Sequence, residues 1–414
     1  MIVPFRGFSV LLPSLILVCS LSAQNALFPI QRPITVNAPG GNGDVNPYGI
    51  AFVPKGSVAG VNSKVSTGDL LISNFNNVQN VAGTGTTITR VTPQGAVSNF
   101  YTATAGHGLT NGLVILQNGM VIVGSLPTNN GVPQSGSILF LNKQGQGVPL
   151  TFNGGTQSGT GAGIGELTNT ILNAGNRAGP FLNPIQGPWS MTLDDNARTG
   201  RASLYVSMVL TGTVVRFDLA YESDAANVAV NAVTQIASGY AHKPDMAGLV
   251  LGPAGLFHFT KIDPKTGTRH DDLYVANSAD NTIYMITDAG WTTQGVTGTA
   301  TGTAIHVLET VPDPNNANAT ITVNPLHGPL GLTMAPNGHL LAANSDPTAS
   351  NDANHPSELI EFATDGTFVS RFSVDPNTGG AFGITFVNLG SAAAQLAFVN
   401  DNQVTVGKLA FPVQ

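Results

Sequence analysis

Cysteine is almost absent from this chain of 414 residues, and the single one is Cys19. It lies in an N-terminal segment in which Arg6 precedes an apolar run over 8–18 and small residues end at Ala23, the pattern of an export signal. The apolar run is too short to cross a bilayer as a permanent helix. We therefore expect a signal peptide over residues 1–23 and a mature chain without thiols, disulfides or cysteine-ligated metals.

This leader predicts an extracytoplasmic protein, either periplasmic or secreted. The alternative is a lipid anchor on Cys19. It is less favoured because Val18 stands where lipid attachment needs a small residue.

Charged residues are also scarce, at 9% of the chain, and the net charge is -7. A protein that binds nucleic acid needs a basic surface against the phosphates, so we expect no nucleic-acid partner. No other apolar run approaches membrane-spanning length, and we expect no transmembrane segment after signal cleavage. The hydrophobic content of 42% is enough for a core, so the 49 glycines and 26 prolines indicate turns rather than disorder.

Familiar signatures of catalysis are missing as well. The chain has no Gly-x-Ser-x-Gly elbow, phosphate loop or dinucleotide fingerprint, and no two histidines stand at metal-binding spacing. The sequence therefore names no catalytic residue and requires no cofactor. Whether the protein is an enzyme stays open, and a non-catalytic role is favoured.

What the chain does have is a sixfold repeat. Each repeat starts with a short strand around a glycine or serine, and a second hydrophobic strand follows that ends in a small or amide residue. Short strands separated by turn residues predict a radial β architecture, in which no unit buries its own faces alone. The equivalent positions in the six starts are Gly49, Gly112, Ser190, Gly255, Gly331 and Gly383.

The fifth repeat predicts a complete four-stranded unit. Its strands are expected over 331–335, 339–344, 358–363 and 368–373. An Asn-Gly turn joins the first two strands and an Asp-Gly turn joins the last two, and both are strong hairpin signals because these residues tolerate a positive φ. Such a unit is one blade of a β-propeller.

The two ends of the chain predict how the ring closes. After Gly383 too few residues remain for a full repeat, and residues 33–36 supply a plausible strand near the N-terminus. Pairing this strand with the last repeat would remove exposed sheet edges. We therefore predict an all-β, six-bladed β-propeller as a single domain over 24–414. A seventh blade between the second and third repeats is the alternative.

The stretch Leu-Tyr-Val-Ala-Asn-Ser-Ala-Asp-Asn-Thr-Ile-Tyr-Met-Ile over 273–286 resembles NHL-repeat and YVTN-type β-propellers. Residues 204–217 and 331–344 are further instances, so the resemblance extends over nearly all of the mature chain. In those families the strand starts line the central channel, and ligands usually lie at one mouth of it. The channel-facing residues that the resemblance implies are Asn46, Asn111, Trp189 and the neighbours of the other strand starts.

Two histidines add to this candidate site. His107 precedes the second strand start and His327 the fifth, and in a ring of six these repeats face each other. A neutral imidazole can bind a metal or move a proton near pH 7, although a histidine at such a junction also caps backbone groups. Trp189 would offer a flat apolar face to a sugar-like or other small polar ligand, or else pack between blades. The predicted ligand-binding residues are Asn46, His107, Asn111, Trp189 and His327.

Four of the repeats end their second strand in asparagine. An asparagine amide can hydrogen-bond the backbone just ahead and open the following loop, so we interpret this column as local structure. A ring of metal or ligand contacts is the alternative interpretation. The column consists of Asn74, Asn277, Asn344 and Asn400.

Two functions are compatible with this pattern. The first is an exported propeller that acts as a binding or interaction platform for a small polar ligand or another extracytoplasmic protein, with specificity in the loops 128–136, 153–186 and 345–356. The second is a metal-dependent hydrolase, lactonase-like or lyase-like, because the fold is distantly similar to that of the gluconolactonase and regucalcin family. That resemblance implies a divalent cation in the axial channel.

The chain departs from the gluconolactonase and regucalcin pattern at a decisive position. Where that family has a glutamate at the first strand start, Asn46 stands here between Val45 and Pro47, with only Asp44 nearby. Asn111, Asn344 and Asp346 are left as other ligands, and neutral amides hold a hard cation poorly compared with carboxylates. We therefore rank the metal-dependent enzyme second.

Overall fold

The computed structural model describes residues 34–37, 42–55, 62–104, 107–152, 155–156, 164–174, 182–224, 226–292, 300–345, 357–387 and 394–410. The predicted signal peptide with Cys19 and most of the loop 345–356, including Asp346, lie outside these residues. Neither helix in the described part of the chain has the length and apolar composition of a membrane span.

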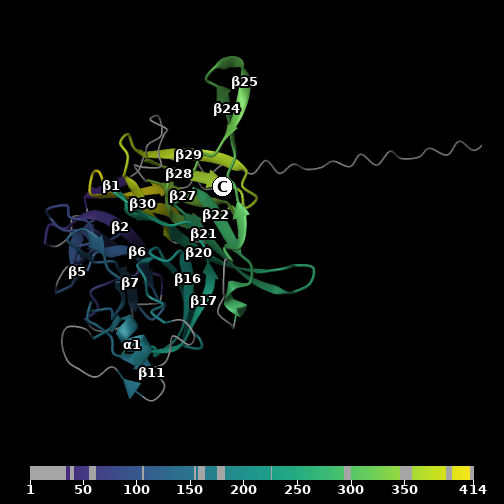
Figure 1. Ribbon diagram of the computed structural model, residues 1–414. Helices are drawn as coiled ribbons and strands as arrows, with labels where there is room; N and C mark the ends of the chain where they lie inside the picture. Colours follow the sequence, from purple (N-terminus) through teal and green to yellow (C-terminus); the bar gives the residue numbers. More distant parts are fainter. Residues whose placement is uncertain are drawn as a thin grey trace, which may run out of the picture.

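The first three blades of the ring are antiparallel sheets that each follow the chain from the axis outward (Figure 1). Blade 1 contains β2 (Val45–Phe52), β3 (Leu70–Asn76), β4 (Thr87–Val91) and β5 (Val97–Thr102). Blade 2 contains β6 (Leu109–Ile115), β7 (Val121–Ser125), β10 (Ser137–Leu141) and β13 (Glu166–Leu167). Blade 3 contains β14 (Pro188–Asn196), β15 (Arg201–Met208), β16 (Thr213–Tyr221) and β17 (Val228–Ser238).

The other three blades complete a six-bladed β-propeller. Blade 4 contains β20 (Pro253–Ile262), β21 (Arg269–Asn277), β22 (Thr282–Ile286) and β23 (Thr303–Ile305). Blade 5 contains β26 (Pro329–Met334), β27 (Leu340–Asn344), β28 (Ser357–Phe362) and β29 (Phe368–Asp375), which confirms the four strands predicted for the fifth repeat. Blade 6 contains β30 (Ala381–Val387), β31 (Gln395–Asn400), β32 (Thr405–Ala410) and β1 (Ile34–Asn37).

The ring closes as the sequence predicts. Strand β1 pairs antiparallel with β32, with Ile34 opposite Lys408 and Asn37 opposite Thr405. The first strand of each blade contacts the first strand of the next, and β2 contacts β30 to complete the circle. The last sheet is therefore built from both ends of the chain.

No seventh blade forms in the described residues between the second and third repeats. This stretch instead supplies β13 to blade 2, and it extends the outer edge of blade 3 through β11 (Leu150–Phe152) and β12 (Gly155–Thr156). It also contains the short helix α1 (Asn169–Ala174). The long interval thus lengthens existing sheets.

Further short elements lie outside the six sheets. Hairpin β24–β25 stands away from the ring in Figure 1. The predicted loop 128–136 holds the hairpin β8–β9. The bounds are β8 (Thr128–Asn129), β9 (Val132–Pro133), β18 (Lys243–Asp245), β19 (Leu249–Leu251), η1 (Ala289–Trp291), β24 (Glu309–Asp313) and β25 (Asn316–Val323).

The glycine column of the repeat marks where inner strands of neighbouring blades approach most closely. A Cβ atom on Gly331 would lie 2.3 Å from the carbonyl oxygen of Phe382, and one on Gly383 would lie 2.5 Å from that of Tyr48. Real Cβ atoms do not come this close to backbone, so a side chain there would push the blades apart. The repeat therefore keeps glycine for close contact between blades.

We expect Gly331→Ala to lower the free energy of unfolding by about 2–3 kcal/mol, because an added Cβ would overpack the contact with Phe382. Chemical denaturation measures this. Gly338→Ala is the control, since a Cβ there meets nothing within 4 Å and its cost is limited to its positive φ. Equal losses for the two variants would contradict the packing explanation.

Candidate functional site

The residue just before each position of the glycine column contributes to a plug at the centre of the ring. Five of these six residues belong to one buried or partly buried hydrophobic cluster. The sixth, Asn111, donates a hydrogen bond from Nδ2 to the carbonyl oxygen of Leu330 at 3.1 Å, which links blade 2 to blade 5. Because all six blades contribute, these residues meet at the axis. They are Tyr48, Asn111, Trp189, Ala254, Leu330 and Phe382.

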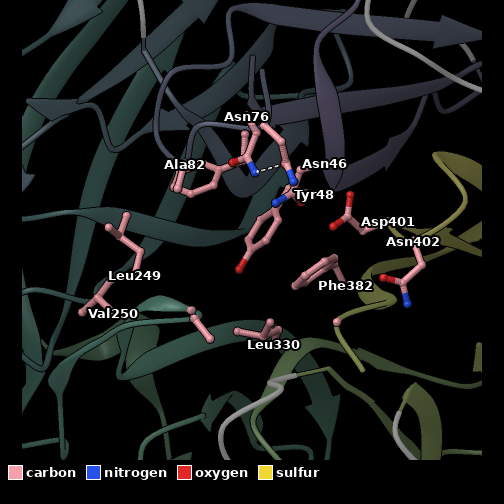
Figure 2. A pocket seen from close by; sticks show the side chains of 15 residues that line it. Asn46, Tyr48, Asn76, Ala82, Leu249, Val250, Leu330, Phe382, Asp401 and Asn402 are labelled. Atoms are coloured by element: carbon pink, nitrogen blue, oxygen red, sulfur yellow. Dashed lines mark hydrogen bonds between the residues drawn. The ribbon is translucent and has the colours of Figure 1, made fainter. Parts of the chain in front are cut away.

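A pocket of about 240 Å³ lies against this plug, at the mouth where the inner strands begin (Figure 2). Its wall comes from the starts of β2, β26 and β30, from the end of β3 and the loop after it, from the β18–β19 hairpin and from the β31–β32 turn. The lining residues are Asn46, Tyr48, Phe75, Asn76, Asn80, Ala82, Ala247, Gly248, Leu249, Val250, Leu330, Gly379, Phe382, Asp401 and Asn402.

Aromatic rings form one side of the pocket. The ring of Tyr48 lies 4.4 Å from that of Phe382 and 5.3 Å from that of Phe75, measured between centroids. Trp189 is buried behind them and meets Tyr48 and Phe75 edge-on, each at 5.4 Å. Trp189 does not line the pocket. Its ring packs at the axis against two side chains of blade 1, so it has a packing role within the plug.

Two asparagines of the pocket have side-chain oxygens that are buried without a donor. Asn76 donates from Nδ2 to Oδ1 of Asn80 at 2.6 Å, and Oδ1 of Asn76 is buried without a donor. The same holds for Oδ1 of Asn46, whose backbone is held at a φ of 59°. Nδ2 of Asn402 donates to Oδ1 of Asp375 at 3.1 Å and to two backbone carbonyls.

Asp401 is the one carboxyl group among the lining residues. Figure 2 shows this group between Asn46 and Phe382. In the described part of the chain no cationic side chain pairs with it, and burial raises the pKa of Asp401 to about 7. The pocket therefore holds a carboxyl group that changes charge near neutral pH.

Of the five predicted ligand-binding residues, Asn46 lines this pocket, and Asn111 and Trp189 belong to the plug. His107 and His327 do not line it. Nε2 of His107 lies 3.7 Å from Oε1 of Glu166 on the outer strand β13, and its presence holds the pKa of Glu166 below its usual range. The backbone N–H of His327 donates to Oδ1 of Asn344.

The sequence interpretation missed most of the pocket wall. Tyr48 and Phe382 occupy the same repeat column as Asn111 and Trp189, so that column was the signal that would have found them. Asp401 stands in a turn after the last asparagine of the repeat, where the sequence marks only a loop. The prediction took Asn111 and Trp189 from this column, whereas Tyr48, Leu330 and Phe382 are its members that line the cavity.

The ligands suggested for a divalent cation are engaged elsewhere. Oδ2 of Asp44 accepts hydrogen bonds from the backbone N–H of Thr86 at 2.6 Å and of Thr87 at 3.0 Å, and also from both hydroxyls. Nδ2 of Asn344 donates to the carbonyl oxygen of Pro325 at 2.7 Å. These side chains join loops to strands. Among the described residues, the suggested ligands do not form a cation site at the mouth of the axis where the inner strands begin.

The asparagine column joins strands and loops of the blades. Nδ2 of Asn74 donates to Oγ1 of Thr87 in the same blade, and that of Asn400 donates to Oδ2 of Asp375 in blade 5. Oδ1 of Asn277 accepts from the backbone N–H of Ala279, two residues ahead, which is the kind of bond that the sequence predicts. These contacts give the asparagines a structural role, but among the described residues the others do not make the predicted bond to the backbone just ahead.

Another group of possible metal ligands does not line the axial pocket and belongs to β14, β20 and β21. One ligand atom from each of its residues lies within 4.8 Å of the others, and the residues are Asp194, His258 and Asp271. Nη2 of Arg269 donates to Oδ2 of Asp194 at 3.0 Å and lies 2.9 Å from Oδ1 of Asp271. Burial lowers the pKa of His258, which stacks on Tyr205. The guanidinium group of Arg269 already pairs with both carboxylates and occupies the position of a cation, so the cluster does not fit a metal ion.

Comparison with known proteins leaves the activity open. No family model and no curated protein matches the chain, so the resemblance to NHL-repeat, YVTN-type and gluconolactonase-like propellers stays a prediction. Among solved structures, the chain is similar to a putative oxidoreductase (glucose dehydrogenase) from Thermus thermophilus, with 14% identity, 91% of this chain and 100% of that chain covered, and a TM-score of 0.41.

Two further structures have the same level of similarity. The Dos1 propeller is 8% identical over 91% of this chain and 95% of its own, with a TM-score of 0.43. An α-L-arabinofuranosidase from Fusarium graminearum is 11% identical over 92% of this chain and 97% of its own, with a TM-score of 0.43. Such distant similarity says nothing about which activity or ligand this chain has.

Proposed function

We propose that this protein is a binding propeller that takes a small ligand with an apolar part and a polar part into the axial pocket. The observation that supports this most is the pocket itself, in which the rings of Tyr48 and Phe382 share the wall with asparagine side chains and one carboxyl group, next to the plug at the axis. A cavity of about 240 Å³ suits a ligand smaller than a typical drug. The leader over 1–23 supports binding outside the cytoplasm.

The chemistry of the wall favours binding over catalysis. Catalysis by a serine, threonine, cysteine, lysine or histidine needs one of these residues at the site, and the lining residues include none; their ionisable groups are Asp401 and Tyr48. A lactonase-like reaction would need a cation, and Asp44 and Asn344 have other hydrogen-bond partners. The pocket therefore fits the first of the two functions that the sequence suggests.

Trp189 provides a reporter for this proposal, because its ring contacts two aromatic side chains of the pocket wall. The chain has 2 tryptophans, so a Trp291→Phe background leaves Trp189 as the only one. We expect at least one compound from a panel of small sugars, amines and amino alcohols, at millimolar concentration, to change Trp189 emission and raise Tm. Ligand binding to the folded state raises Tm by mass action.

Two neighbouring variants separate the pocket from the surrounding surface. Ala247 is an exposed residue at the rim of the pocket, so Ala247→Trp should fill the entrance and abolish the ligand-induced rise in Tm, which is the readout for this variant because it adds a second tryptophan. Met246 is fully exposed and does not line the pocket, so Met246→Trp should leave binding unchanged. The proposal is contradicted if no compound in the panel gives a signal, or if both variants bind as the parent does.

A further inference from the structure

We infer that the ligand of the axial pocket is a protonated primary amine with an apolar substituent, whose ammonium group pairs with Asp401 beside the rings of Tyr48 and Phe382. This inference rests on the proposed function and names the ligand class for that same site. It is carried by three features of the pocket: its charge, its hydrogen-bond pattern and its aromatic wall.

The charge of the wall is unbalanced. Asp401 and Tyr48 are the only titratable side chains among the lining residues, and no lysine, arginine or histidine lines the pocket. A partly buried carboxylate without a cation is unfavourable, and burial alone accounts for the raised pKa of Asp401. A cationic ligand would supply the missing charge, whereas an anion would meet a like charge.

The open hydrogen-bonding groups near Asp401 favour a donor. The amino group of Asn402 is already used by Asp375 and two backbone carbonyls, which leaves its Oδ1 as a further acceptor beside Asp401. Oδ1 of Asn46 and Oδ1 of Asn76 also have no donor, but both atoms are buried and are not accessible from the cavity. An ammonium group has three donors and no acceptor, so it complements Asp401 and Oδ1 of Asn402 better than a hydroxyl group.

The aromatic wall fits the same ligand. A cation is attracted to the faces of aromatic rings, and this attraction is stronger where water is excluded. Tyr48 and Phe382 lie 4.4 Å apart, and Asp401 lies on the same side of the pocket in Figure 2. Leu249, Val250 and Leu330 add apolar surface for a hydrocarbon substituent. A small aralkyl or alkyl amine therefore matches the wall in charge and in apolarity.

A matched pair of probes tests this inference. Phenethylamine and phenethyl alcohol have almost the same shape and differ in an ammonium or a hydroxyl group. By titration calorimetry at pH 8, we expect the amine to bind at least about tenfold more tightly than the alcohol. The affinity for the amine should fall between pH 8 and pH 6, because Asp401 takes up a proton there while a primary amine stays charged.

The matched variants are Asp401→Asn and Asp365→Asn. Asp401→Asn should remove the preference for the amine and its pH dependence. Without ligand, the same variant should raise Tm at pH 8, because a raised pKa means that the ionised form costs stability above pH 7, and this gain should vanish near pH 4. Asp365 is an exposed turn carboxylate that accepts from the N–H of Thr367, so Asp365→Asn should leave the preference intact.

The outcomes distinguish this inference from the proposal on which it rests. If the alcohol or a neutral sugar binds as tightly as phenethylamine, and Ala247→Trp abolishes that binding, the pocket is a ligand site but the amine is wrong. If the preference survives in Asp401→Asn, the assignment of Asp401 is wrong. If neither probe nor sugar binds, both the ligand class and the pocket function are contradicted.

Discussion

Deleting residues 24–40 is expected to lower Tm by about 10 °C or more, because strand β1 would no longer pair with β32. The last blade would keep three of its strands and expose the backbone of β32 as an unpaired edge. Since every blade packs on two neighbours around the ring, a weakened blade 6 also weakens its contacts with blades 5 and 1. Scanning calorimetry measures the loss, and light scattering measures the self-association expected of an exposed edge.

A shorter deletion is the matched control for ring closure. Removing residues 24–32 leaves β1 (Ile34–Asn37) in place, so its Tm should stay close to that of the undeleted chain. If both deletions lower Tm equally, or if neither does, pairing of the two chain ends does not hold the ring together. The comparison separates loss of the strand from loss of the segment before it.

Glu361→Ala is expected to lower the free energy of unfolding by about 3–5 kcal/mol, through loss of a buried polar network in blade 5. Oε1 of Glu361 lies 2.6 Å from Nδ1 of His339 and accepts from Nδ2 of Asn337 at 3.0 Å. Oε2 accepts from the hydroxyl of Ser370 at 2.7 Å. His339 and Glu361 have side-chain exposures of 1% and 0%, so water does not replace the lost acceptor.

Two further variants define the cause of this loss. Glu361→Gln keeps an acceptor oxygen in the same place and should cost about 1–3 kcal/mol. Glu222 is exposed, and Glu222→Ala should change stability by less than about 0.5 kcal/mol. Denaturant unfolding of the three variants gives the order. A loss for Glu361→Ala no larger than that of Glu222→Ala would show that the network does not stabilise the blade.

The blades could be predicted from the sequence because their signals are local. Asn337-Gly338 and Asp365-Gly366 mark hairpin turns, and the strands of blade 5 begin and end within a few residues of their predicted bounds. The glycine column recurs because a Cβ would clash where the next blade crosses the inner strand, as at Gly331, and only the third repeat has a larger residue there, Ser190. A tight turn or a close contact between blades each needs a particular residue type at one position. Such a requirement can therefore be recognised in the sequence.

Ring closure could also be predicted from the number of strands. The last repeat has too few residues for four strands, and the N-terminal part of the chain supplies the fourth, β1, which pairs with β32. The stretch before the third blade was interpreted less well. The sequence predicts a loop over 153–186, yet Glu166–Leu167 forms the outer strand of blade 2. A pair of residues is too short to show a strand pattern, and its pairing with β10 depends on where the surrounding loop lies.

The pocket was decided by the tertiary structure. Asn46 near one end of the chain, Leu249 in the β18–β19 hairpin and Asp401 in the last turn meet only because the ring brings six inner strands to one axis. The tertiary structure also decided which carboxyl groups have hydrogen-bond partners. Asp44 accepts hydrogen bonds from Thr86, just before β4, and from Thr87, its first residue. Asp401 lines the cavity without a cationic partner in the described part of the chain. The sequence by itself determined the blades, because turns and close backbone contacts are properties of single positions. The pocket depends on contacts between segments that are far apart in the sequence, and such contacts cannot be recognised from the residue at any one position.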